Sequence, residues 1–174
     1  MHSTSKNHYF MPDKATIERA KRDKKEGKSA STQAGEFVHS EIDKIRAGKH
    51  GARNTKQAIA IGLSEARRAG VDLKPPKKGT TSEKTRANAK RELEKGQRHE
   101  PVSKTRSQAR EKALKKESTS AASHKALSQQ ARSAAEKRSA TDRSAAAKKA
   151  AATKGPRERS AAAKKAAKTR ASHR

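Results

Sequence analysis

Apolar side chains are concentrated between Ser31 and Gly79, which is where the chain shows its clearest helical pattern. Nine of its large aliphatic or aromatic residues lie there: Phe37, Val38, Ile42, Ile45, Ile59, Ile61, Leu63, Val71 and Leu73. The 95 residues after Gly79 contain four more: Leu93, Val102, Leu114 and Leu127. If part of the protein folds around buried apolar surface, we expect it to be residues 31–79.

The first predicted helix of this stretch is defined by Val38, Ile42 and Ile45. These residues recur at i, i+4 and i+7, which places them on one face of a helix. Ser31 or Thr32 is expected to cap its start. Gly48 follows the last apolar position and supplies a left-handed residue to end the helix.

The second predicted helix begins at Asn54, with Gln57 at the third helical position in an approximate capping box. Its apolar positions recur at i, i+3, i+4 and i+7, namely Ile59, Gly62, Leu63 and Ala66. Gly70 is expected to end it, with Val71 folding back and Pro75-Pro76 preventing continuation. Because the link between the two helices is short, they predict an αα-hairpin.

Charged helices are predicted on both sides of the hairpin. Asp13–Glu26 is a helix candidate that Gly27 ends, and its small apolar face of Ile17 and Ala20 favours a solvated helix. Further helix-prone segments follow at Ser82–Lys95, Ser103–Lys116 and Ala121–Arg138.

The last part of the chain contains imperfect repeats of the type RSAAAKKAA, which start at residues 132, 143 and 159. Their irregular spacing indicates a low-complexity array and not a solenoid. We therefore predict a mainly α protein in four parts. They are an N-terminal extension and charged helix (1–30), a helical-hairpin domain (31–79), a basic helical linker region (80–128) and a largely disordered or locally helical tail (129–174).

The composition limits how much of the chain can fold. Hydrophobic residues make up 29% of the sequence, charged residues 36% and aromatic residues 2%, which is typical of a largely unfolded or singly helical chain. A hairpin of this length is small for an independent core. Packing by neighbouring helices, or a partner, is expected to contribute.

The charge indicates a polyanionic partner. Lys and Arg number 45 against 18 Asp and Glu, a formal net charge of +27. Residues 129–174 hold 14 of these basic residues against three acidic ones, a net charge of +11. Such a charge favours nucleic acid, because releasing counterions drives binding without any shape requirement.

Candidate phosphate contacts fall into two groups. The first surrounds the start of the second helix, where backbone N–H groups and the helix dipole favour an anion, and extends along that helix. Its members are Lys49, His50, Arg53, Lys56, Arg67 and Arg68. The second group lies in the tail: Arg143, Lys148, Lys149, Arg159, Lys164, Lys165, Lys168 and Arg170. An ordinary helical-hairpin turn with a solvated basic rim remains the alternative for the first group.

Several classes of function are disfavoured. The chain has no cysteine, which excludes disulfides, thiolate nucleophiles and cysteine-ligated metals. We expect no cofactor, no metal site and no enzymatic activity, since the histidines are scattered and no glycine-rich phosphate loop follows a strand. A membrane role is not expected either, because the last 47 residues contain no Leu, Phe or Trp.

The run IRAGKHGARNTKQAIAIGLSEARRAGVDLKPPKKG, from Ile45 to Gly79, resembles a family of small basic bacterial proteins known as a domain of unknown function. The KHGAR and TKQAIAIGL segments carry the resemblance, which implies an N-terminal charged helix and an Ala/Lys/Arg-rich tail. Asn54 and Glu65 stand where Ser and Lys are expected, which lowers the local positive charge. The tail is similar to those of linker-histone-like bacterial proteins.

These observations predict nonspecific nucleic-acid binding, to DNA more than to RNA, by a cytoplasmic, nucleoid-associated protein. The alternative is a helical interaction or assembly module. In that case the hairpin would self-associate or bind another protein, and the cationic tail would only keep the chain in solution.

Overall fold

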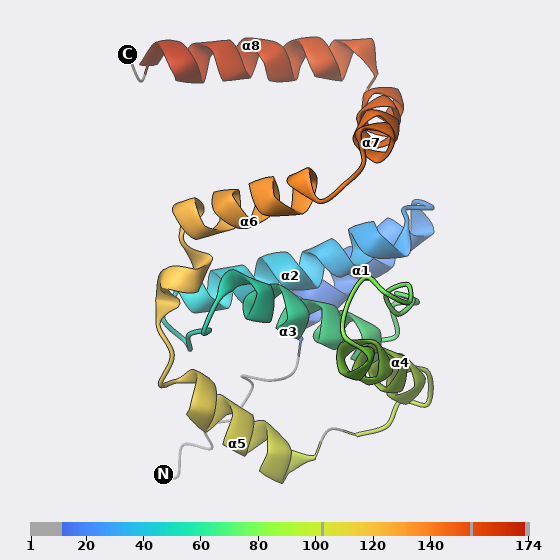
Figure 1. The fold of residues 1–174 in the computed structure, drawn as a ribbon, viewed down its shortest axis with the longest axis vertical. Coiled ribbons are helices and arrows are strands. Elements are labelled where there is room, and N and C mark those ends of the chain that lie inside the picture. Colours follow the sequence, from blue (N-terminus) through green and yellow to red (C-terminus); the bar gives the residue numbers. More distant parts are fainter. Residues whose placement is uncertain (1–11, 102, 154, 173–174) are drawn as a thin grey trace. The chain divides into compact units, whose positions relative to one another are not determined.

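The computed structural model describes residues 12–101, 103–153 and 155–172, and every regular element in these ranges is a helix. The elements in order are α1 (Lys14–Lys25), α2 (Ala30–Arg46), α3 (Thr55–Arg68), α4 (Glu83–Gln97), α5 (Lys104–Leu114), the 3-10 helix η1 (Thr119–Ala122), α6 (His124–Glu136), α7 (Ala140–Thr153) and α8 (Pro156–Ser172) (Figure 1). The predicted mainly α fold class is confirmed. The N-terminal extension predicted before Pro12 lies outside the described residues.

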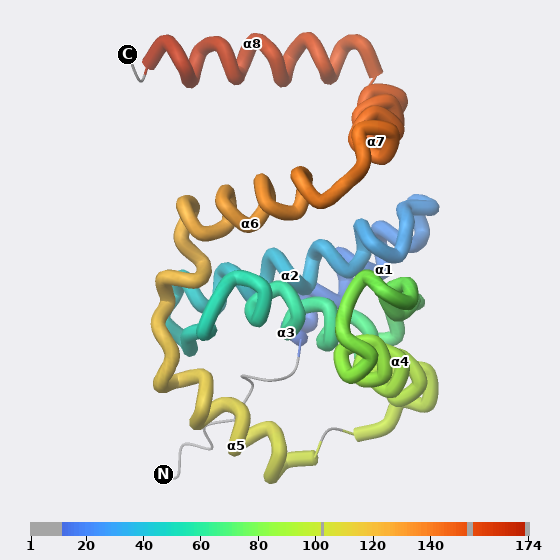
Figure 2. Tube along the Cα trace, viewed as in Figure 1, coloured from blue at the N-terminus to red at the C-terminus, as the bar shows by residue number. Residues whose placement is uncertain are grey.

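The chain divides into two units, Met1–Gln130 and Ala131–Arg174. The first unit contains the hairpin of α2 and α3, which run side by side in opposite directions (Figure 2). The second contains α7 and α8, whose described side chains are exposed apart from one half-buried alanine, Ala151. We describe the two units separately.

Capping residues set the ends of the hairpin helices largely as predicted. Asn54 caps α3 by accepting a hydrogen bond from the Gln57 N–H at 2.9 Å, and Gly48 and Gly70 adopt left-handed conformations with φ of 70° and 87°. The predicted cap of α2 is wrong by two residues or more. Ser29 caps this helix, and its hydroxyl accepts from the Thr32 N–H.

α2 and α3 cross at Gly62, where the two backbones come very close. A Cβ atom at Gly62 would lie 2.7 Å from the Cα of Val38. Large and small apolar side chains from both helices fill the core beside this crossing, including Phe37 and Ile45 from α2 and Ala66 from α3, all 1% exposed or less. Gly62 therefore allows α2 and α3 to pack closely although the core between them contains few large side chains.

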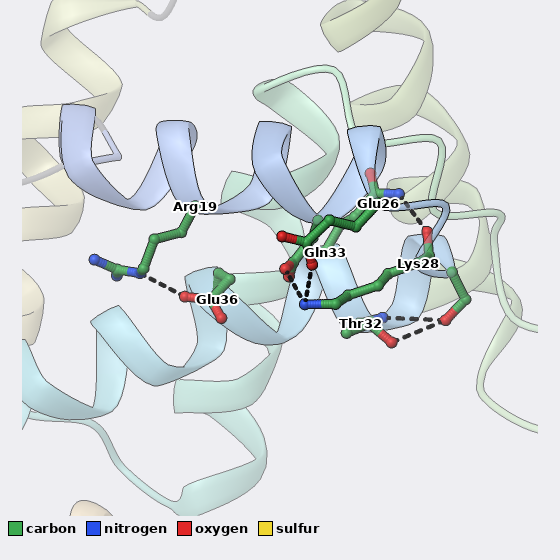
Figure 3. Close-up of polar contacts among 8 residues, drawn as sticks. Arg19, Glu26, Lys28, Thr32, Gln33 and Glu36 are labelled. Atoms are coloured by element: carbon green, nitrogen blue, oxygen red, sulfur yellow. Dashed lines mark hydrogen bonds and ion pairs between the residues drawn. The ribbon is translucent and has the colours of Figure 1, made fainter. Parts of the chain in front are cut away.

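α1 is not the fully solvated helix that the sequence favoured. It packs along α2 and buries Thr16, Ala20 and Asp23. Arg19 forms an ion pair with Glu36 of α2 (Figure 3). The packing was not evident from the sequence because two of the three buried residues are polar.

The turn between α1 and α2 is held by charged groups. The Lys28 ammonium lies 2.8 Å from carboxylate oxygens of both Asp23 and Glu26. The Gln33 side-chain amide donates to the backbone oxygen of Lys28 at 2.8 Å (Figure 3). These contacts fix the angle at which α1 returns along α2.

The first unit extends well beyond the predicted hairpin. α4 packs on α3, with Gly96 so close to the backbone of Arg67 that a Cβ atom would overlap it. Leu114, Ala121 and Ala122 are 5% exposed or less. Neighbouring segments of the same chain thus complete the core, mainly through small side chains that a search for large apolar residues passes over.

Candidate nucleic-acid interface

The loop between α2 and α3 places three of its predicted cationic residues at the surface. Lys49, Arg53 and Lys56 are exposed around the start of α3. The backbone N–H of Arg53 donates to the Gln57 side-chain oxygen at 2.8 Å, which completes the polar cap of this helix end. These three cations are therefore exposed on the loop and the first turn of α3, and we call them the basic rim.

His50 does not belong to this rim. It is 4% exposed, and its Nε2 lies 3.6 Å from the buried Glu41 carboxylate while Nδ1 lies 3.1 Å from the Gly51 carbonyl oxygen. The Glu41 carboxylate raises the pKa of His50, burial opposes the rise, and the Gly51 carbonyl adds to it. The prediction of His50 as a surface phosphate contact is not matched by its position, because the residue faces the core.

The segment from the last residue of α5 to the end of η1 covers the loop. We call residues 114–122 the strap. The Gly51 N–H donates to the Leu114 carbonyl at 2.9 Å, the Ala52 N–H to the Ser118 carbonyl at 3.0 Å, and the Thr55 hydroxyl to the Ala121 carbonyl at 2.7 Å. These hydrogen bonds occupy two backbone N–H groups near the start of α3 that an anion could otherwise use.

Gly51 explains how the strap fits so closely. A Cβ atom on this residue would overlap the backbone carbonyl of Glu117. The backbone that lies against Gly51 is that of the strap. The loop thus has a structural role, and its cationic rim remains exposed beside it.

Arg67 and Arg68 lie at the far end of α3 and do not extend this rim. They are about 17 Å and about 18 Å along the helix from Lys56, at about 1.5 Å per residue. Arg67 is 7% exposed and donates to the Leu73 carbonyl at 3.0 Å, and burial lowers its pKa against the opposing effect of Glu92. Arg68 forms an ion pair with Glu92 at 3.0 Å. Both side chains therefore hold α3 to its neighbours.

The predicted tail residues are all exposed on two helices. α7 carries Arg143, Lys148 and Lys149, and α8 carries Arg159, Lys164, Lys165, Lys168 and Arg170. On α8, Lys164, Lys165 and Lys168 fall within an arc of about 100°, because successive residues are about 100° apart around a helix. This arc presents a dense cationic face, with Arg159 and Arg170 on the other side.

Sequence reasoning missed a group of buried charges beneath the loop. Glu41 and Lys44 of α2 and Glu65 of α3 are 1%, 5% and 7% exposed. The Lys44 ammonium lies 3.6 Å from the Glu65 carboxylate. A signal was present, because Glu41 and Lys44 follow Phe37 at i+4 and i+7 and so share its buried face.

Membrane-spanning helices and metal-binding clusters are both absent from the described residues. None of the helices in the described ranges is long and apolar enough to cross a bilayer. The same ranges contain no cluster of three or more His, Asp or Glu side chains suited to a metal ion.

Comparison with known proteins finds a family match for part of the chain. No curated protein and no solved structure gives a significant match. Residues 9–78, which contain α1, α2 and α3, match a protein family of unknown function (DUF6496).

Proposed function

We propose that this chain is a sequence-independent DNA-binding protein of the bacterial nucleoid, and that its C-terminal helices make most of the phosphate contacts. The observation that carries the proposal is the exposure of every predicted basic residue on α7 and α8. Exposed Lys and Arg side chains can reach phosphates without any change in the packing of the fold. Alanine between them favours helix without needing a core.

The driving force is counterion release from DNA. Each phosphate that a Lys or Arg neutralises frees condensed cations, so affinity falls as salt rises. The rim formed by Lys49, Arg53 and Lys56 provides a second, smaller group of contacts in the other unit. No base-specific readout is required by this arrangement.

The packing of the first unit supports this proposal over an interaction module. An assembly role would favour an open apolar face on the hairpin. In this chain α1, α4 and η1 contact the hairpin helices themselves. A second copy or partner is therefore not needed to explain how the hairpin buries its apolar surface.

The test is a salt titration of binding to duplex DNA. If about eight phosphates are neutralised, the slope of log affinity against log salt should be roughly −7. A variant in which the eight predicted basic residues of α7 and α8 are replaced by Gln should show a much shallower slope. A matched control replaces eight alanines of the same helices by Ser and should keep the slope.

The outcome that contradicts the proposal is an unchanged slope in the Gln variant. Competition with RNA in the same assay decides the preferred nucleic acid, for which we expect DNA. Sedimentation of the protein without DNA measures its oligomeric state and so tests the alternative of an assembly module. A stable oligomer combined with salt-insensitive binding would favour that alternative.

A further inference from the structure

Four charged or titratable side chains meet in the interior between α2, the α2–α3 loop and α3. Glu41, Lys44, His50 and Glu65 are each 7% exposed or less. Two contacts of 3.6 Å join them, His50 Nε2 to Glu41 Oε1 and Lys44 Nζ to Glu65 Oε2. In the described part of the chain, Glu41 Oε1, Lys44 Nζ and both Glu65 oxygens have no hydrogen-bond partner.

The charge of this cluster depends on its protons. Two carboxylates and one ammonium leave one negative charge in the interior when His50 is neutral. A buried charge is costly unless it is paired, so one additional proton on the cluster restores balance. Asp13, at the start of α1, adds to the negative field at Glu65, and it accepts a hydrogen bond from Ser40 at 3.3 Å.

The position of His50 favours its protonated form. Its two ring nitrogens face two acceptors, the Glu41 carboxylate and the Gly51 carbonyl oxygen. Only the imidazolium has an N–H on both nitrogens, so only this form can donate to both acceptors. In the neutral ring, one nitrogen lone pair would face an oxygen.

The same histidine is linked to the strap through one residue. Gly51 accepts from the His50 ring with its carbonyl and donates its own N–H to the Leu114 carbonyl. The next N–H, that of Ala52, donates to Ser118. A change in the protonation of His50 therefore acts directly on the backbone that holds the strap.

We propose that the cluster of Glu41, Lys44, His50 and Glu65 is a proton-operated latch. With one added proton, the cluster is balanced and the strap is docked on the loop. When the proton is lost, the interior carries excess negative charge and the loop and strap open more often. The ligand of this site is the proton itself.

Protonation of His50 and protonation of Glu65 both stabilise the closed form. The pKa of His50 is raised above its usual 6.5, and burial raises the pKa of Glu65 from 4.5 to about 7, against the opposing effect of Lys44. A raised pKa in the folded state means that the closed form binds protons more tightly than the open form. The stabilisation is thus complete at low pH and is lost as pH rises through the folded-state pKa values.

Hydrogen exchange at Gly51 and Ala52 measures the latch in the full chain, because both N–H groups bond to the strap. Protection factors, corrected for the intrinsic effect of pH on exchange, are compared at pH 5.5 and pH 8. If opening hydrates Glu65, its shift alone predicts roughly a 30-fold loss of protection over this range. Equal protection at the two pH values would overturn the proposal.

Glu65→Gln separates the latch from other pH effects. The amide keeps the size of the side chain and cannot ionise, so the loss of protection should become several-fold smaller. Glu36→Gln is the matched control, because Glu36 lies on α2 in a partly exposed ion pair with Arg19, and its variant should behave like the wild type. The same pH dependence in Glu65→Gln as in wild type would also overturn the proposal.

A direct titration keeps the proposal testable if Glu65→Gln does not fold. NMR of the wild-type chain should show His50 keeping its proton to a pH above 6.5, the usual pKa of a histidine. A pKa of His50 at or below 6.5 would refute the latch.

Discussion

Replacing Gly62 with alanine tests whether the hairpin depends on the close crossing of α2 and α3. The added Cβ atom would lie 2.7 Å from the Val38 Cα and 2.9 Å from its backbone nitrogen. Ordinary contacts at such an atom begin near 3.4 Å. Because the obstructing atoms belong to the backbone, no rotamer change can relieve the overlap. To reach an ordinary contact of 3.4 Å from 2.7 Å, the two helices must separate by about 0.7 Å.

The expected magnitude follows from two opposing effects. A gap of this size forfeits roughly a quarter to a half of the dispersion energy of the atoms across it. Overpacking typically lowers stability by about 1–3 kcal/mol, and a rigid backbone contact belongs at the upper end. Alanine is a better helix former than glycine by about 1 kcal/mol. We therefore expect a net loss of about 2 kcal/mol, or a fall in Tm of roughly 8 °C.

Gly35→Ala is the matched control. Gly35 also lies within a helix, α2, but it is exposed and has no atom within 4 Å of the position of a Cβ. The free energy of unfolding of this variant should exceed that of the wild type by about 1 kcal/mol, because alanine has the higher helix propensity and meets no obstructing atom. Thermal and urea unfolding of both variants measure the difference. If Gly62→Ala were as stable as Gly35→Ala, the close crossing would not describe the protein in solution.

Two further predictions concern the loop. Gly51→Ala should undock the strap, because its Cβ would overlap the Glu117 carbonyl; we expect a loss of roughly 1–3 kcal/mol in urea unfolding and faster exchange of the Ala52 amide. Unchanged exchange would contradict this. The double variant Arg53→Ala, Lys56→Ala should have the melting temperature of the wild type or a slightly higher one, because the helix dipole disfavours a cation in the first turn. In the same variant, the slope of log affinity for DNA against log salt should become shallower by about 2. Lower stability with unchanged affinity would make the rim purely structural.

Local features of the sequence were enough to predict the hairpin. Asn54 and Gln57 cap α3 through hydrogen bonds within four residues, and Gly70 ends it with a positive φ. The cap of α2 was misplaced because Ser29, Ser31 and Thr32 are all good capping residues within four positions. Signals of this kind depend on neighbours in the chain, so they can be found without knowing the tertiary structure.

The strap and the buried cluster could not be predicted in the same way. The hydrogen bond from Thr55 to Ala121 joins residues 66 positions apart, and nothing near either residue specifies it. His50 was assigned to the surface by its basic neighbours, although its partner is Glu41 on the preceding helix. The sequence contained the charges but not the contacts that pair them.

The way this chain packs also explains why one proton can matter to it. Its core relies heavily on alanine and on glycines at close crossings, so each contact removes little apolar area from water and contributes little free energy. Small domains are stable by only about 5–15 kcal/mol, and a core of small residues is expected near the lower end of that range. A pKa shift from 4.5 to about 7 at Glu65 corresponds to roughly 3–4 kcal/mol at most, at about 1.4 kcal/mol per pKa unit. We therefore expect protonation of the cluster to supply a substantial part of the net stability of this fold, and a smaller part in a domain with a large aliphatic core.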